Sequence, residues 1–355
     1  MFYRETGIFK TSYAADMALY PLPLSRWALG GIGVLLLIVV PFVASDYVLT
    51  VLNLILVAVV GAVGLNILTG YAGQISIGQG GFMAVGAYTA AKLITVWHAP
   101  FWLAVPAGGA MTALVGTFVG IPSLRIKGLY LAIATLAAQF IIEWLINHVT
   151  WISGGIQATI QMPAPVVFGI GIRSQLQFYL FLLGFAVLAV VAAKNFARSR
   201  LGRACIAVRD QDIAAEIIGI DIFRTKLTAF AISSFYAGVA GALYSYYLGI
   251  ANYEQFGLSV SIDYLAMIII GGLGSVTGSI LGAAFITLLP VVTRRALSMA
   301  GSLLPGSFDA AGVLPEVRLC LFGALIILFL VAEPEGLDRL WRNVRGYFRT
   351  WPFSY

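Results

Sequence analysis

Long apolar runs, each close to the length needed to cross a lipid bilayer, follow one another along most of this 355-residue chain. A transmembrane helix needs about 20 predominantly apolar residues. Hydrophobic residues make up 60% of the sequence and charged residues only 10%, whereas soluble domains carry about 25% charged residues. The sequence therefore predicts an all-α polytopic membrane protein with about 8–10 transmembrane helices.

The apolar windows divide the chain into three regions. The first 26 residues are expected to be an N-terminal cytoplasmic segment of the mature protein rather than a signal peptide. Residues 27–332 form the transmembrane domain, and 333–355 form a basic and aromatic cytoplasmic tail that suits an interfacial anchor or a solvated tail. The expected spans are 27–44, 48–68, 80–97, 101–121, 128–147, 176–193, 227–249 and 316–332, with a longer interrupted apolar stretch at 262–293.

Lys and Arg residues set the expected orientation, because short cytoplasmic loops carry an excess of positive charge. The N-terminal segment, the polar stretch 194–226 and the tail are placed inside on this ground. The stretch 262–293 must then enter and leave on the outer side, which leaves Arg294 and Arg295 outside, against the rule. The net charge of +6 arises from loops beside apolar runs, so no nucleic-acid partner is expected.

Two glycine-rich segments that also contain polar residues, 70–81 and 271–279, interrupt the apolar pattern. They are expected to form broken or re-entrant helices. Non-helical backbone at membrane depth is tolerated where it is buried in protein or lines an aqueous cavity. The segments can therefore mark a translocation pathway, or they can serve close helix packing. The pathway candidates are the polar residues Asn66, Gln74, Ser76, Gln79, Ser275 and Thr277, and the helix-break glycines are Gly73, Gly78, Gly271 and Gly274.

The stretch 194–226 is the one long polar segment, with seven Lys/Arg and four Asp/Glu. A short helix is expected at 211–218, ended by a glycine in the left-handed conformation. Such a helix between two membrane spans could dock a soluble partner, and the alternative is a solvated loop. The expected coupling residues are Arg209, Asp210, Asp212, Ala214, Ala215, Glu216 and Gly219.

Catalytic and metal-binding motifs are missing from the sequence. It contains no G-x-x-x-x-G-K-[ST] segment and no convergent His, Cys, Asp and Glu residues. We expect no catalytic residue, no metal site and no cofactor in this chain, so ATP and magnesium would have to be bound by a separate ATPase chain.

The segment around Ala214, Ala215, Glu216 and Gly219 resembles the EAA coupling loop of ABC-importer permeases, although it reads IAAEIIG without a literal E-A-A triplet. Residues 9–16 (FKTSYAAD), 64–91 and 262–285 are similar to the M-type permease subunits of branched-chain (hydrophobic) amino acid importers. The resemblance implies the ABC-importer permease fold and a multi-pass location in the bacterial inner membrane. It also implies a second permease, two ABC ATPase subunits and a periplasmic substrate-binding protein as partners.

Other functions remain open at this point. Importers of urea, short amides or aromatic acids resemble the same family. An autonomous secondary transporter would need ionisable residues near the middle of the membrane, and an integral-membrane enzyme would need a His, Asp and Glu cluster at a helix end. Neither pattern is evident in the expected spans.

Overall fold

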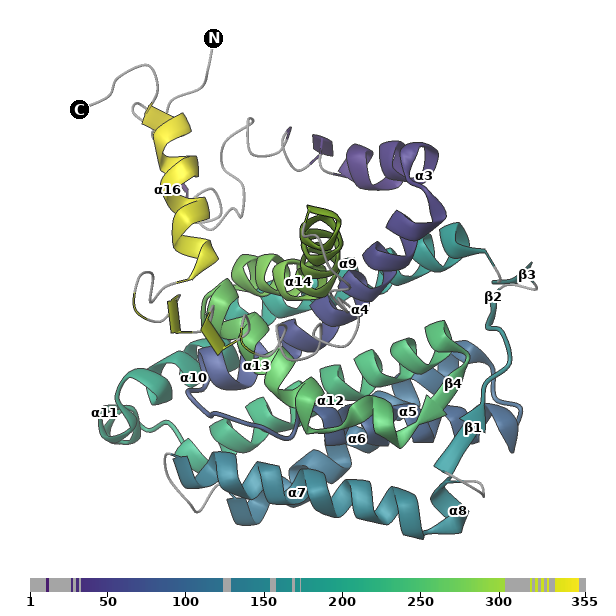
Figure 1. Cartoon of the computed structure of the whole chain (residues 1–355). Coiled ribbons are helices and arrows are strands. Elements are labelled where there is room, and N and C mark those ends of the chain that lie inside the picture. Colours follow the sequence, from purple (N-terminus) through teal and green to yellow (C-terminus); the bar gives the residue numbers. More distant parts are fainter. Residues whose placement is uncertain are drawn as a thin grey trace.

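The computed structural model is a bundle of helices with two short pairs of strands (Figure 1). It describes residues 33–123, 129–153, 158–167, 170–172, 174–303 and 336–350, with a few isolated positions between 11 and 31 and between 320 and 331. The helices are η1 (Leu35–Val39), α3 (Val40–Val43), α4 (Asp46–Asn66), η2 (Ile67–Tyr71), α5 (Gln79–Thr95), α6 (Phe101–Ser123), α7 (Leu129–His148), α8 (Thr150–Ser153), α9 (Gln175–Arg198), α10 (Arg200–Asp210), α11 (Asp212–Ile217), α12 (Ile222–Leu248), η4 (Tyr253–Phe256), α13 (Leu258–Gly271), α14 (Val276–Leu303) and α16 (Leu337–Thr350). The strands are β1 (Thr159–Gln161), β2 (Val166–Val167), β3 (Ile170–Gly171) and β4 (Ile250–Asn252), paired as β1 with β4 and β2 with β3.

Seven helices within the described residues are long and apolar enough to cross a membrane. Helix α5 has 17 residues and is slightly shorter than these seven. The prediction of an all-α polytopic membrane protein is therefore confirmed. The expected span at 27–44 lies partly outside the described residues, and that at 316–332 lies mostly outside them.

The interrupted apolar stretch forms the helix pair α13 and α14, separated by the short connection 272–275. The expected break is found, but the bounds of 262–293 were too narrow, because α13 begins at Leu258 and α14 continues past Pro290 to Leu303. In Figure 1, the connection lies on the side of the bundle that carries α10 and α11, and the paired strands β1 and β4 lie at the opposite end.

Helices α5, α6 and α12 form the tightest part of the bundle because small residues face one another there. A Cβ atom added to Gly86 of α5 would overlap the backbone of Gly238 of α12. A Cβ atom at Gly108 of α6 would lie 2.7 Å from the carbonyl oxygen of Gly86, and one at Gly238 would overlap Thr112. These contacts hold three helix backbones at a separation that larger side chains would prevent.

The polar stretch 194–226 is mainly helical, which corrects the expectation of a loop with one short helix. Helix α9 extends to Arg198, and α10 begins directly afterwards because the side chain of Ser199 accepts a hydrogen bond from the Gly202 amide (3.1 Å). The short helix α11 covers Asp212–Ile217 rather than 211–218, since Gln211 has an extended backbone (φ −157°). In Figure 1, α11 is at the edge of the molecule and α10 connects it to the bundle.

Candidate functional site

Asn66, the last residue of α4 and four residues before the first glycine-rich segment, is hydrogen-bonded to the second segment. Its side-chain nitrogen donates hydrogen bonds to the carbonyl oxygen of Ser275 and to Ser279 Oγ, both at 2.7 Å. Its side-chain oxygen accepts a hydrogen bond from the Gly274 amide at 2.9 Å. Asn66 is only 1% exposed, so these three bonds replace the solvent contacts that a buried amide loses. Asn66 therefore fixes the end of α4 to the connection between α13 and α14.

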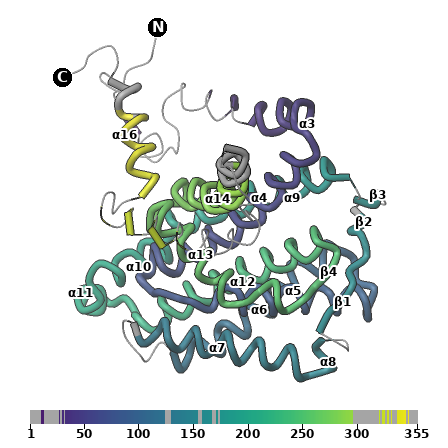
Figure 2. The backbone as a smooth tube through the Cα atoms, in the orientation of Figure 1, coloured from purple at the N-terminus to yellow at the C-terminus, as the bar shows by residue number. Residues whose placement is uncertain are grey.

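Arg209, near the end of α10, contacts both segments. Its Nη1 donates a hydrogen bond to the carbonyl oxygen of Gly70 at 2.7 Å. A Cβ atom at Gly73 would lie 2.9 Å from Arg209 Cγ, and one at Gly274 would lie 3.1 Å from Arg209 Nη1. The guanidinium is also paired with Asp210 (Nη2 to Oδ1, 2.8 Å). As the tube in Figure 2 shows, α10 thus connects α11 at the edge of the molecule with the ends of α4 and α13.

The four helix-break glycines fall into two groups. Gly73 and Gly274 have φ of +68° and +78°, a conformation that glycine adopts with little strain. Gly78 and Gly271 are needed for close contact instead. A Cβ atom at Gly78 would lie 2.8 Å from the carbonyl oxygen of Thr135, and one at Gly271 would overlap the carbonyl group of Gly278.

Gln74 is the pathway candidate with unusual surroundings. It is 2% exposed, and both polar atoms of its side chain are buried without a hydrogen-bond partner among the described residues. Ser76 and Gln79, also 2% exposed, do have partners: Ser76 Oγ accepts from the Gly78 amide (3.4 Å), and Gln79 Nε2 donates to the Gly61 carbonyl oxygen (3.2 Å). An unpaired buried amide costs about 1–3 kcal/mol, so a state that gives Gln74 a partner would be favoured.

Ser275 and Thr277 connect the same region to α16. Their hydroxyl groups lie 2.8 Å apart, and Thr277 Oγ1 donates a hydrogen bond to Asp338 Oδ1 at 2.5 Å. Asp338 is 6% exposed and is paired with Arg342 (3.5 Å). Sequence reasoning missed Asp338. The available signal was an acidic residue two positions after Gly336, in a tail whose other charges are mostly basic.

The tip formed by α11 presents an apolar face that the sequence pattern did not reveal. Ile213, Ile217 and Ile218 are 67%, 80% and 74% exposed, whereas the smaller Ala215 is buried. Ala214 and Glu216 are exposed, and Asp212 begins the helix. Large apolar side chains displayed together on a protruding element are typical of a protein-interaction site.

Gly219 ends α11 as expected, with φ of +89°. Its amide donates to the Glu216 carbonyl oxygen (2.9 Å), and the Ile220 amide donates to the Ala215 carbonyl oxygen (3.0 Å). These bonds satisfy the last carbonyl groups of the helix. The left-handed conformation predicted for this glycine is confirmed.

Cysteine labelling can test the pathway candidates. Burial raises the pKa of the native Cys205 thiol in α10 to about 11, so at pH 7–8 it is a protonated, inaccessible thiol that reacts slowly. In a Cys320→Ser background, Gln74→Cys and Ser76→Cys should be protected in the state described here and should react with small polar thiol reagents in a second transport state. Ser275→Cys, at a half-buried position, should react in both. Protection of all three positions under every condition would mean that the segments are packing features only.

Known proteins of similar sequence support one family. Residues 47–330 match the family model described as branched-chain amino acid transport system / permease component. The chain is 32% identical to the high-affinity branched-chain amino acid transport system permease protein LivM of Escherichia coli (strain K12), over 84% of this chain and 71% of LivM. It is 24% identical to the permease protein LivH of Salmonella typhimurium, over 78% of this chain and 89% of LivH.

A more distant relative is named for a different cargo. The autoinducer 2 import system permease protein LsrC of Enterobacter sp. (strain 638) is 28% identical, over 52% of this chain and 53% of LsrC. No solved structure matches the chain. The family match covers well over half of the chain, and it agrees with the apolar helices. The chain belongs to the permease-component family of branched-chain amino acid transport systems.

Proposed function

We propose that this chain is the M-type permease subunit of an ATP-driven ABC importer for branched-chain (hydrophobic) amino acids. It would form the translocation pathway with a second, homologous permease in the bacterial inner membrane. Two ATPase subunits would supply the energy, and a periplasmic binding protein would deliver the amino acid. ATP and magnesium would be bound by the ATPase subunits and not by this chain.

The contact of Arg209 with both glycine-rich segments is the observation that carries this proposal. The apolar tip of α11, where Ile213 and Ile217 are exposed, could bind a partner protein. Helix α10 follows directly on the bundle side of that tip, and its Arg209 donates a hydrogen bond to the Gly70 carbonyl oxygen. Movement of the tip would therefore displace the ends of α4 and α13 together. An ATPase that closes on ATP could use this connection to change access to the pathway.

Other substrates and mechanisms make different predictions. An importer of urea, amides or aromatic acids would share the Arg209 connection and differ only in the transported molecule. An autonomous secondary transporter would need neither the exposed tip nor a partner.

Reconstitution distinguishes these functions. The chain should be purified with the subunits that copurify with it and placed in proteoliposomes with the candidate binding protein. We expect uptake of leucine only when ATP is present on the ATPase side, and no uptake by the chain alone. Leucine uptake by the single subunit, driven by a proton or sodium gradient, would contradict the proposal. ATP-driven uptake of urea or an aromatic acid without leucine uptake would keep the mechanism and change the substrate.

The C-terminal end of α11 offers a test of coupling. Gly219→Val should cost about 1–2 kcal/mol locally because a branched side chain is strained at positive φ. A Cβ atom at this position would contact nothing within 4 Å, so the membrane helices should still fold. We expect the variant to assemble less well with the ATPases or to hydrolyse ATP without transport, whereas Gly219→Asn, which tolerates positive φ better, should stay close to wild type. Copurification measures assembly, and leucine-stimulated ATPase activity measures coupling. Wild-type values of both for Gly219→Val would mean that the α11 tip does not take part in coupling.

A further inference from the structure

Helix α16 is attached to the bundle through its first residues. Gly336, directly before it, has φ of +68°, and a Cβ atom there would lie 2.6 Å from the carbonyl oxygen of Ile270 near the end of α13. Asp338 is 6% exposed and accepts the hydrogen bond from Thr277 Oγ1 at the start of α14. The start of α16 is therefore fixed beside the connection between α13 and α14.

Beyond this attachment, α16 runs across the bundle. In Figure 1 it crosses the direction of α7 and α12, on the side of the molecule that carries α10 and α11. A helix that runs across the membrane helices lies along the bilayer surface. The expected span 316–332 ends shortly before α16 begins, so the chain would pass from the bilayer directly into this helix.

One face of α16 is apolar and exposed. Leu337, Leu340, Trp341 and Val344 share this face because they are three or four residues apart. Leu337 packs against the hydrophobic core, but the other three are 43%, 51% and 48% exposed. On a helix that runs along the bilayer surface, such a face fits the boundary between lipid headgroups and acyl chains.

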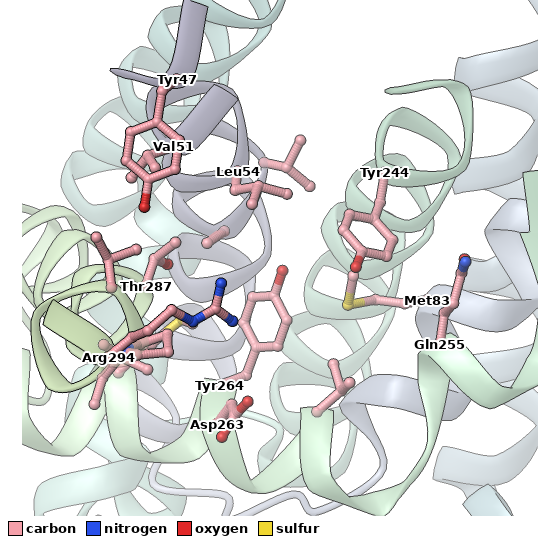
Figure 3. A pocket seen from close by; sticks show the side chains of 17 residues that line it. Tyr47, Val51, Leu54, Met83, Tyr244, Gln255, Asp263, Tyr264, Thr287 and Arg294 are labelled. Carbon is pink, nitrogen blue, oxygen red and sulfur yellow. The ribbon is translucent and has the colours of Figure 1, made fainter. Parts of the chain in front are cut away.

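The cavity within the bundle does not receive this face. The cavity has a volume of about 390 Å³, lies among α4, α5, α12, α13 and α14, and is bordered by Asp263 of α13 and Arg294 of α14 (Figure 3). None of the residues that border it belongs to α16. A partner for the apolar face of α16 would therefore have to lie outside the described part of the chain.

The rest of α16 is basic. Four arginines against one aspartate give the helix a net charge of +3. The arginines recur every three or four residues and are Arg339, Arg342, Arg345 and Arg349. The aspartate is the buried Asp338, which is paired with Arg342 at 3.5 Å. Attraction to an anionic lipid surface depends on the net charge, at a factor of about five for each Lys or Arg, and does not need any arginine to be unpaired.

We infer that α16 docks on the anionic lipid surface of the membrane, on the side of α10 and α11, with Leu340, Trp341 and Val344 toward the acyl chains. A bilayer accommodates the apolar face and the positive charge together, and tryptophan is enriched at this depth. Because Asp338 joins α16 to Thr277, lipid that holds α16 would also hold the connection between α13 and α14. Only the assignment of this side as cytoplasmic rests on the proposed function.

An environment-sensitive fluorophore on α16 tests the inference. It would be attached to Val344→Cys in the Cys320→Ser background, and the complex with its copurifying subunits would be placed in nanodiscs. One set contains phosphatidylcholine alone and the other phosphatidylcholine with phosphatidylglycerol, each with and without a lipid that carries a nitroxide quencher on its acyl chain. We expect blue-shifted emission and lipid quenching in the anionic nanodiscs, and a partial loss of both in phosphatidylcholine alone and at high salt. The Cys320→Ser parent, treated in the same way, gives the background from other cysteines.

Two variants separate the apolar and the charged contributions. Trp341→Gln should reduce lipid quenching in both sets of nanodiscs, because less apolar area is buried on docking. The double variant Arg345→Gln/Arg349→Gln should lower the docking equilibrium in anionic nanodiscs about 25-fold, at about fivefold for each charge. It should also remove most of the difference between the two lipid compositions.

Matched control variants change the same residue types elsewhere. Trp151→Gln replaces a tryptophan of α8 that is 83% exposed. Arg200→Gln/Arg203→Gln removes two exposed arginines of α10. Both controls should leave the emission and the quenching of the label on α16 as in the parent.

Three results would overturn the inference. Water-like emission in both sets of nanodiscs would make α16 a solvated helix. Blue-shifted emission without lipid quenching would mean that another subunit covers its apolar face. Equal quenching in both sets, unchanged in the double arginine variant, would remove the role of anionic lipid. ATP-driven leucine uptake by the same complex is measured separately, so each of these results is distinguishable from a failure of the proposed function.

Discussion

Gly86→Ala should destabilise the protein by about 1–3 kcal/mol, although alanine is the better helix former by about 1 kcal/mol. The added methyl group would overlap the carbonyl oxygen and Cα of Gly238. These are backbone atoms and cannot rotate away, so α5 and α12 must separate and lose contacts along their length. The loss should appear as a lower midpoint of thermal unfolding in detergent, or as a lower yield of monodisperse protein.

Gly184→Ala in α9 is the matched control. No atom outside the local helix lies within 4 Å of a Cβ atom at that position, so only the gain in helix propensity remains. Its thermal midpoint should equal or exceed that of the wild-type protein. Equal midpoints for the two alanine variants would contradict the close packing of α5 on α12.

Asn66→Ala should lower the free energy of unfolding by about 3–5 kcal/mol, because three buried groups lose the hydrogen bonds that they make with the Asn66 amide. The Gly274 amide, the Ser275 carbonyl oxygen and the Ser279 hydroxyl would each lose a bond of 2.7–2.9 Å. The same variant should loosen the contact between the two glycine-rich segments. Thermal unfolding of the purified complex measures the first effect, and limited proteolysis after α4 measures the second.

Asn53→Ala on the same helix provides the comparison. Asn53 is also fully buried, but its side-chain nitrogen makes longer bonds to Gln175 (3.2 and 3.3 Å), and its side-chain oxygen has no partner among the described residues. Asn53→Ala should therefore lower the free energy of unfolding by only about 1 kcal/mol. A larger loss for Asn53→Ala than for Asn66→Ala would mean that Asn66 does not fix the end of α4 to the connection between α13 and α14.

The lengths of the apolar runs and the local turn chemistry were sufficient to predict much of the fold from the sequence. The apolar windows predicted the membrane helices, because a span needs a fixed number of apolar residues whatever it packs against. The glycine-rich run at 271–279 correctly marked the connection between α13 and α14. Gly219 could be assigned because positive φ at the end of a helix strongly favours one residue type.

Contacts between distant segments could not be read from the sequence in the same way. Nothing local to Arg209 indicates that its guanidinium reaches the Gly70 carbonyl oxygen, 139 residues earlier in the chain. Asp263 of α13 and Arg294 of α14 likewise border one cavity from different helices, and the charge rule gave no reason to expect this. The polar stretch was expected to be a loop because polarity separates membrane from water, but it does not separate helix from loop.

The most direct measurement of the central claim compares Arg209→Gln with Arg203→Gln in the reconstituted complex. Both residues lie on α10, but Arg203 is exposed and bonds only locally, to the Arg198 carbonyl oxygen (2.6 Å), in the structure described. ATP hydrolysis and ATP-driven leucine uptake should be measured on the same preparations. We predict that Arg209→Gln keeps assembling and hydrolysing ATP while its uptake per ATP falls about tenfold or more, and that Arg203→Gln matches the wild type. Wild-type uptake per ATP in Arg209→Gln would contradict the claim that α10 transmits movement of α11 to the two glycine-rich segments through this side chain.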